Sequence, residues 1–317
     1  MGKKQKGEVM EMPEMAGDSV RVEIPEMAED GVTVEMPEME EDSVTVEVFP
    51  RERRPLEIGF SSIIGTRKSQ QDSIFGHVNG TKALAIVCDG MGGLSGGEQA
   101  SRLAVESLMK DWFENEEIGD IPAFLEQAAR KADEQVFRQK DDRGEPLKAG
   151  TTIVAAVVRG DELYWLSVGD SRIYIIRGNE IMAVNQKHNY RMTLNSRLKK
   201  GEITKEEYAA QEYRAEALIS YLGMGNISLM DINQRPFLLE DGDVVVLCSD
   251  GLYKSLSEEE IFGLVQINER NTQKMAEALT EAALEKKKVK QDNTSVIVLR
   301  CCLGKMEKTE MEDVGCS

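Results

Sequence analysis

The 317-residue sequence is poor in the residue types from which zinc sites and thiol-based active sites are built. It contains only two histidines, His77 and His188, and its five cysteines show no metal-type spacing, so we do not expect zinc. No cysteine stands in the C-x5-R pattern of a phosphate-binding loop, which argues against a phosphocysteine intermediate.

Long apolar runs and an excess of positive charge are also missing. No apolar run approaches the roughly 20 residues that cross a bilayer, and the first residues lack the apolar stretch of a secretory signal. We therefore expect no membrane insertion. The net charge of -18 argues against a nucleic-acid partner. Cys88 and Cys248 lie within apolar runs, as reduced core thiols do, which predicts a cytoplasmic location.

What the sequence does contain begins with an acidic tandem repeat. Residues 1–50 carry 14 acidic and 4 basic side chains, a net charge of -10. Three copies of 12 residues align there without gaps: Glu11–Val22, Glu23–Val34 and Glu35–Val46. Their small apolar content predicts a disordered tail. The alternative is an interaction tail, in which the alternating "SVTVE" adds a strand to a partner's sheet. Residues 303–317 are predicted to form a second disordered tail.

Between these tails, residues 51–302 show the pattern of one α+β domain. Apolar runs such as "KALAIVCDG" and "TTIVAAVVRG" predict strands, whereas "GGEQASRLAVESLMKDWFE" and "IPAFLEQAARKADEQVFRQ" predict amphipathic helices. Further helices are predicted at about Ser257–Val265 and Thr272–Lys287, and a polar helical insert at about 190–221. Strands in runs, separated by a helix pair, favour a four-layer αββα sandwich of two antiparallel sheets that pack face to face between helices.

An aspartate stands at or beside the end of five predicted strands: Asp72, Asp89, Asp170, Asp250 and Asp292. Any one of them is explained by a turn, because Asp-Gly is a common hairpin pair. Five carboxylates at one end of a sandwich would repel each other unless cations joined them. Hard divalent cations with oxygen ligands, Mg²⁺ or Mn²⁺, meet that need, and a pair of such ions is a general device for phosphoryl chemistry.

A phosphate substrate also calls for a protein cation. Arg67 lies five residues before Asp72, and the planar fork of arginine suits a phosphate group. An exposed arginine on an edge strand is an equally good interpretation of the spacing alone.

Six segments, in order, carry a resemblance to a known family: "GTRKSQQDS", "VCDGMGG", "AGTTIVAAVV", "WLSVGDSRIYIIR", "VVLCSDGLYKSLSEEEI" and "QDNTSVIVL". From Leu56 to Leu299 the chain resembles the metal-dependent protein phosphatases of type 2C. Met91 in "DGMGG" makes the bacterial branch the nearer match. The resemblance implies that the insert is a mobile flap beside the site.

The resemblance also implies a ligand set for two ions. Asp89 would bridge both ions, with the carbonyl of Gly90 as a further ligand. Asp250 and Asp292 would bind one ion, and Asp72 would hold a water on the other.

Two further roles follow from the same resemblance. Asp170 matches the aspartate that binds a third, weaker ion together with Asp250. Arg67 matches the phosphate-binding arginine. Two departures stand beside these matches: Gln71 replaces the usual glutamate, and Met91 offers no proton to the leaving group.

The function that the resemblance implies is hydrolysis of phosphoserine and phosphothreonine monoesters by a water that Mn²⁺ or Mg²⁺ activates. The expected partners are phosphoproteins made by a serine/threonine kinase, and the expected state is a monomer, with a further partner for the repeats. One alternative is a pseudophosphatase that acts as a regulatory binding module. Another is a phosphatase of an anti-sigma-factor antagonist.

Overall fold

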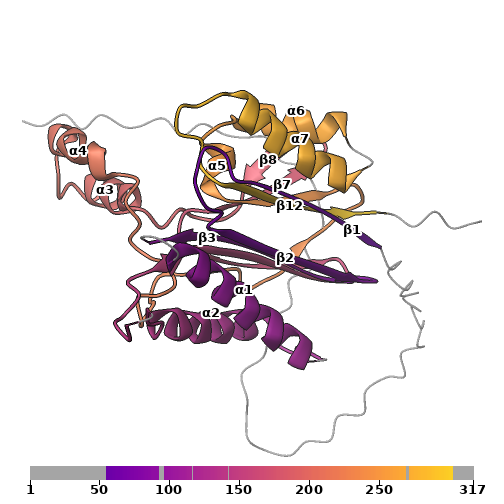
Figure 1. Ribbon diagram of the computed structural model, residues 1–317. Coiled ribbons are helices and arrows are strands. Elements are labelled where there is room, and N and C mark those ends of the chain that lie inside the picture. The colour runs from indigo at the N-terminus through magenta and orange to yellow at the C-terminus, as the bar shows by residue number, and fades with distance from the viewer. Residues whose placement is uncertain (1–54, 93–95, 116, 142, 269–270, 303–317) are drawn as a thin grey trace, which may run out of the picture. The chain divides into compact units, whose positions relative to one another are not determined.

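The structure is a computed structural model that describes residues 55–302 except 93–95, 116, 142 and 269–270. The acidic repeats and the predicted C-terminal tail lie outside the described residues. Two antiparallel sheets form the centre of the domain (Figure 1). The first has the strand order β1 (Leu56–Ile63), β12 (Thr294–Cys301), β11 (Val244–Cys248), β7 (Arg172–Arg177) and β8 (Glu180–Ala183).

The second sheet contains the longest strand of the described residues, β3 (Lys82–Met91). Its order is β10 (Phe237–Leu238), β6 (Glu162–Val168), β5 (Ile153–Arg159), β3 and β2 (Asp72–Asn79). Two short strands lie off this path: β4 (Gly150–Thr151) pairs with β3, and β9 (Asp231–Ile232) pairs with β6.

The period-two pattern of β3 explains the layering. Ala83, Ala85 and Val87 pack between the sheets with residues of β7, β11 and β12. The alternate residues Leu84, Ile86 and Cys88 pack against helices on the outer face. Because neighbouring side chains of a strand point to opposite faces, a strand that is apolar at every position must be covered on both sides.

Helices supply the two outer layers. The helices α1 (Gly96–Glu114) and α2 (Ile121–Phe137) cover the second sheet. On the outer face of the first sheet lie α6 (Glu258–Ile267), α7 (Thr272–Glu285) and the short α5 (Asp250–Tyr253). The predicted α+β class, a four-layer αββα sandwich, is thus confirmed (Figure 1).

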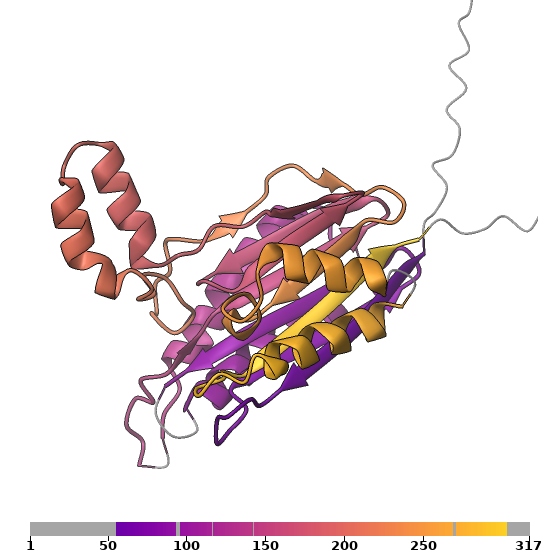
Figure 2. The same ribbon diagram turned by 90° about the horizontal axis from the view of Figure 1, so that it is seen from above.

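The predicted insert carries helices, as expected, but they end well before residue 221. It holds α3 (Tyr190–Lys199), α4 (Lys205–Gln211) and a 3-10 turn, Glu212–Arg214. A small apolar cluster of its own joins them, made of Leu194, Ile203 and Ala215. Figure 2 shows this helix pair projecting from one end of the sandwich.

Some observed elements differ in extent from the predicted ones. The strand expected at "TTIVAAVVRG" is split into β4 and β5 at Thr152, whose N–H donates to the carbonyl of Asp89 at 2.9 Å instead of continuing a ladder. The short elements α5, β9 and β10 were not predicted, because so few residues show no periodicity. No helix among the described residues is long and apolar enough to span a bilayer.

Candidate active site

Two of the five aspartates face each other across neighbouring strands. Asp72 opens β2, Asp89 lies near the end of β3, and the antiparallel register pairs them directly. Side chains at paired positions share one face of a sheet. Asp89 has the same parity as Ala83, Ala85 and Val87, so both carboxylates face the first sheet.

The first sheet brings its aspartates to the same end. Asp250 follows directly on β11, and Asp292 stands just before β12. Because these strands are antiparallel neighbours, the end of one lies beside the start of the other. The hydroxyl of Ser249 joins the two sheets here, since it donates to Oδ2 of Asp72 at 2.8 Å. Asp170 stands in the β6–β7 connection, where β7 begins beside the end of β11.

The electrostatics reflect this convergence. Burial raises the pKa of Asp72 to about 7, and the charges of Asp250 and Asp292 add to the rise against the lowering effect of hydrogen bonds from serine hydroxyls. Burial also raises the pKa of Asp89 well above its ordinary range, reinforced by the other four carboxylates. The pKa of Asp170 is raised by burial and by Asp250. The structure therefore brings together all five aspartates that the sequence analysis selected.

Protein cations balance part of this negative charge. Nη2 of Arg67 donates to Oδ2 of Asp292 at 2.5 Å, from the loop between β1 and β2. Arg67 thus lies at the site and not on an edge strand. Lys254 forms an ion pair with Asp250. It was not predicted, although its position four residues after Asp250 places both on one side of α5.

Two carboxylate oxygens of the site have no hydrogen-bond donor among the described residues. Oδ1 of Asp72 and Oδ1 of Asp250 are buried and accept no hydrogen bond among the described residues. A buried acceptor without a partner is costly, and carboxylate oxygens are the ligands that Mg²⁺ and Mn²⁺ prefer. The donor set therefore fits hard divalent cations.

The side chains as arranged do not yet form a closed ligand shell. Within the described ranges, no group of three or more His, Cys, Asp or Glu side chains is gathered tightly enough to hold an ion. The ion pairs of Asp292 with Arg67 and of Asp250 with Lys254 occupy oxygens that an ion would need. Binding would require these carboxylates to turn toward each other.

The backbone of Asp89 and Gly90 is held firmly. The hydroxyl of Thr151 donates to the carbonyl of Asp89 at 2.9 Å, and the N–H of Asp89 donates to the hydroxyl of Thr152 at 3.1 Å. The N–H of Gly90 donates to the carbonyl of Gln71 at 3.1 Å. These threonines stand in "AGTT", but their contact with residue 89 depends on a strand pairing that local sequence does not reveal.

Gly90 is required by close packing. A Cβ at this position would lie 2.1 Å from the carbonyl oxygen of Gly97 and 2.6 Å from that of Gln71. The strand end, the start of α1 and residue 71 therefore meet backbone to backbone. The amide of Gln71 donates toward the carbonyl of Gly92 at 3.4 Å, so this departure from the family pattern contacts the same loop.

Met91, two residues after Asp89 at the end of β3, lines a cleft of about 570 Å³. Phe137, Tyr221 and Met224 also line this cleft, and the ring of Phe137 is 57% exposed. A largely apolar hollow therefore opens at the end of β3 that carries Asp89, although none of its lining residues is an aspartate.

Comparison with known proteins identifies the family. The family model for protein phosphatase 2C matches residues 61–290. The serine/threonine phosphatase stp of Listeria welshimeri is 29% identical over 202 residues, which are 63% of this chain and 78% of that protein. The serine/threonine protein phosphatase PstP of Mycobacterium tuberculosis is 32% identical over 232 residues, 73% of this chain but only 42% of PstP.

Solved structures agree with this match. The crystal structure of M. tuberculosis PstP/Ppp superposes with a TM-score of 0.66 at 28% identity, covering 78% of this chain and all of that one. A second structure, of the PstP catalytic domain in complex with two manganese ions, has a TM-score of 0.63 at 28% identity and covers 79% of this chain. Five aspartates converge from the strand ends of both sheets, and the family model matches most of the chain, so the chain belongs to the protein phosphatase 2C family.

Proposed function

We propose that this protein is a metal-dependent serine/threonine phosphatase that hydrolyses phosphoserine and phosphothreonine monoesters on proteins. The observation that carries the proposal is the convergence of five buried or partly buried aspartates, two with unpartnered oxygens among the described residues, beside an arginine. The two manganese ions in the PstP structure, and the similarity to the serine/threonine phosphatases stp and PstP, support the same assignment.

Within this proposal, Asp89, the carbonyl of Gly90, Asp250 and Asp292 hold two Mn²⁺ or Mg²⁺ ions, and Asp72 holds a water beside them. Asp170 with Asp250 holds a third, weaker ion. Ions in such a cluster lower the pKa of water and offset charge on a phosphate group.

The protein's own groups bind and orient the substrate. Arg67 offers two parallel N–H donors to a phosphate, and its side chain is 52% exposed, so a substrate can reach it. Met91 has no proton to donate, so the leaving alkoxide takes its proton from water. We also propose that the cleft between Met91 and Phe137 receives apolar residues that flank the phosphorylated side chain.

The proposal also covers the cellular role, the location and the oligomeric state of the protein. The enzyme would act in bacterial signalling as the counterpart of a serine/threonine kinase, as a monomer in the cytoplasm. Cys88 and Cys248 are buried thiols, as a reducing compartment allows. A pseudophosphatase is disfavoured because such proteins lack metal-binding aspartates, and all five are retained here.

The decisive experiment is a titration of Mn²⁺ into the EDTA-treated full chain, followed by calorimetry and by hydrolysis of a phosphothreonine peptide in the same samples. We expect at least two ions per chain, with activity rising as the second binds. Asp292→Asn should lose one ion and most turnover. Asp120→Asn is the matched control. Asp120 caps the N-terminus of α2 and is not one of the site aspartates, and asparagine caps a helix equally well. Full activity in EDTA, or saturation at one ion, would refute the assignment.

A further inference from the structure

One lysine lies among the aspartates of the site. Lys254 follows Asp250 by four residues, and its ammonium forms an ion pair with Oδ2 of that aspartate. The N–H of Lys254 also donates to the carbonyl of Asp250 at 3.0 Å, so the two residues are held one helical turn apart. Because residues four apart on a helix are neighbours, the ammonium stays within reach of the carboxylate.

The turn that carries this pair is fixed against the first sheet. A Cβ at Gly251 would lie 2.1 Å from the carbonyl oxygen of Asn293, so α5 meets the segment before β12 backbone to backbone. Leu252 is fully buried in the core on the outer face of the same sheet. The backbone of α5 therefore cannot carry Lys254 away from Asp250 without disturbing this packing.

The same turn also contacts Asp170. The hydroxyl of Tyr253 donates to Oδ2 of Asp170 at 3.3 Å, and the ammonium of Lys187 lies 3.7 Å from the centre of the Tyr253 ring. Burial and the charge of Asp250 raise the pKa of Asp170, and the charges of both lysines offset part of that rise. Lys254 thus acts on Asp170 as well as on Asp250.

Three carboxylates act in turn on the Lys254 ammonium. Burial opposes its charge, yet the carboxylates of Asp250, Asp170 and Asp89 together raise its pKa above the ordinary value. The side chain therefore keeps its positive charge. Among the described residues, Lys254 and Arg67 are the cations that form ion pairs with the five aspartates.

The charges of the cluster balance when two ions are bound. The five aspartates carry five negative charges, two divalent ions supply four positive charges, and Lys254 supplies a fifth. The charge of Arg67 is then left for the phosphate. A third divalent ion would enter a neutral cluster, and it would meet the Lys254 ammonium at Asp250. Like charges at such short range repel strongly.

From these contacts we propose that the Lys254 ammonium competes with a divalent cation for Asp170 and Asp250, and so sets the low affinity of the third ion. The inference rests on the proposed function, since it takes the two-ion centre as given. Lys254 is not itself a ligand, because an ammonium group has no lone pair to offer a metal. Its role is to supply positive charge where a third ion would otherwise supply it.

Counting bound Mn²⁺ tests the inference without any measurement of turnover. Mn²⁺ is titrated into the EDTA-treated full chain, and free Mn²⁺ is read from its electron paramagnetic resonance signal. The wild-type chain should bind two ions and a third more weakly. Lys254→Gln should tighten the weakest-bound ion roughly tenfold, because it removes one positive charge beside that ion. Lys254→Arg keeps the charge and should retain the wild-type affinity.

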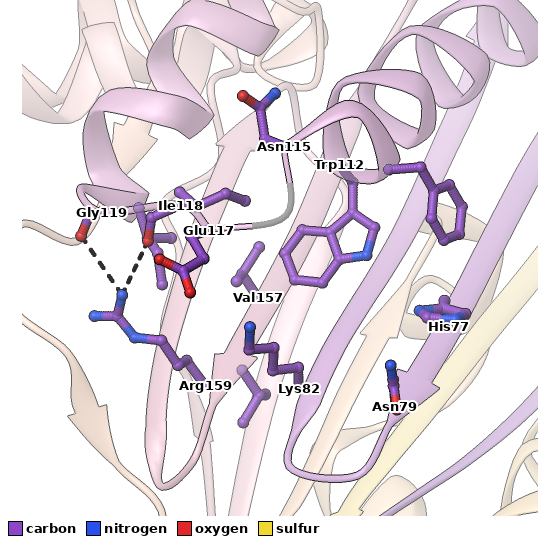
Figure 3. Close-up of a pocket in the computed structure, with 13 residues that line it drawn as sticks. His77, Asn79, Lys82, Trp112, Asn115, Glu117, Ile118, Gly119, Val157 and Arg159 are labelled. Carbon is purple, nitrogen blue, oxygen red and sulfur yellow. Dashed lines mark hydrogen bonds between the residues drawn. The ribbon is translucent and has the colours of Figure 1, made fainter.

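Lys82→Gln is the matched control for a general effect of charge. Figure 3 shows Lys82 lining a separate cleft, of about 720 Å³. Lys82 is seven residues along β3 from Asp89, which is about 23 Å at the rise of a strand. Salt screens charges over such a distance, so the affinity of the weakest-bound ion should not change.

A double variant locates the effect. Lys254→Gln combined with Asp170→Asn should lose the gain in affinity, because the third ion would no longer find the carboxylate that it needs. A gain that persists in this double variant would place the effect of Lys254 at another ion and would overturn the inference.

Three further results would overturn it. The first is an unchanged dissociation constant of the weakest-bound ion in Lys254→Gln. The second is equal tightening in Lys254→Arg, which would make the bulk of lysine and not its charge the cause. The third is equal tightening in Lys82→Gln. Each of these would leave the proposed function intact as long as the wild-type chain binds two ions, whereas a wild-type chain that binds no Mn²⁺ would refute both.

Discussion

Replacing Gly90 by alanine tests whether the close backbone packing at the end of β3 sets the geometry of the active site. The added Cβ would lie 2.1 Å from the carbonyl oxygen of Gly97, and ordinary contact begins at 3.4 Å. The start of α1 or the end of β3 must therefore move by about 1.3 Å. Both neighbours are backbone, so no side chain can rotate away to relieve the contact.

The size of the effect follows from this displacement. Overpacking of this kind costs about 1–3 kcal/mol of stability. For a domain of this size that lowers the melting temperature by roughly 2 to 12 °C. A misplacement of about 1 Å at a catalytic group can reduce turnover by about a hundredfold. Because Asp89 is the adjacent residue, we expect the loss of turnover to exceed the loss of folded protein.

The assay is phosphopeptide hydrolysis in saturating Mn²⁺, together with thermal unfolding of the same preparation. Gly263→Ala is the matched control: this glycine lies inside α6, and a Cβ there meets no atom within 4 Å. Alanine in a helix interior should stabilise the protein by about 0.5–1 kcal/mol and leave turnover unchanged. Wild-type turnover and melting temperature for Gly90→Ala would refute the reasoning.

Four further predictions concern single residues. Asp89→Asn should reduce turnover by at least about a hundredfold, with partial rescue by excess Mn²⁺, because it removes one negative charge from the proposed metal site; steady-state kinetics against Mn²⁺ concentration checks this. Arg67→Ala should raise KM more than it lowers kcat, since the contact is made to ground-state phosphate as well as to the transition state; a large fall in kcat at constant KM would contradict the role. Asp133→Ala should destabilise the fold by about 3 kcal/mol or more in urea unfolding, because the buried carboxylate accepts three backbone N–H groups from residues 223–227; Asp133→Asn, which keeps one acceptor, should cost less. Burial lowers the pKa of His188 below its ordinary 6.5. The stability tied to its neutral form is therefore complete above about pH 6.5 and is lost as pH falls through the lowered value. The free energy of unfolding in urea should fall with pH across this range, and His188→Asn should reduce that pH dependence.

The sequence by itself was sufficient for the long elements and for the aspartates of the site. The apolar run of β3 and the amphipathic spacing of α1 are local properties, so their limits could be read to within a residue. The aspartates were found because each stands where an apolar run ends, which is again a local feature. Resemblance to a family then supplied their expected roles.

Only the tertiary structure decided which strand ends, and therefore which site residues, lie next to each other. Ser249 reaches Asp72 across 177 residues, and Arg67 reaches Asp292 across 225. Local periodicity carries no information about such distances, because strand order and sheet packing are set by the burial of the whole core. Asp133 is a further example. In the sequence of α2 it is one polar residue among several, and nothing local predicts that it is buried. Its carboxylate accepts backbone N–H groups from a loop about ninety residues away, and only the tertiary structure brings the two together.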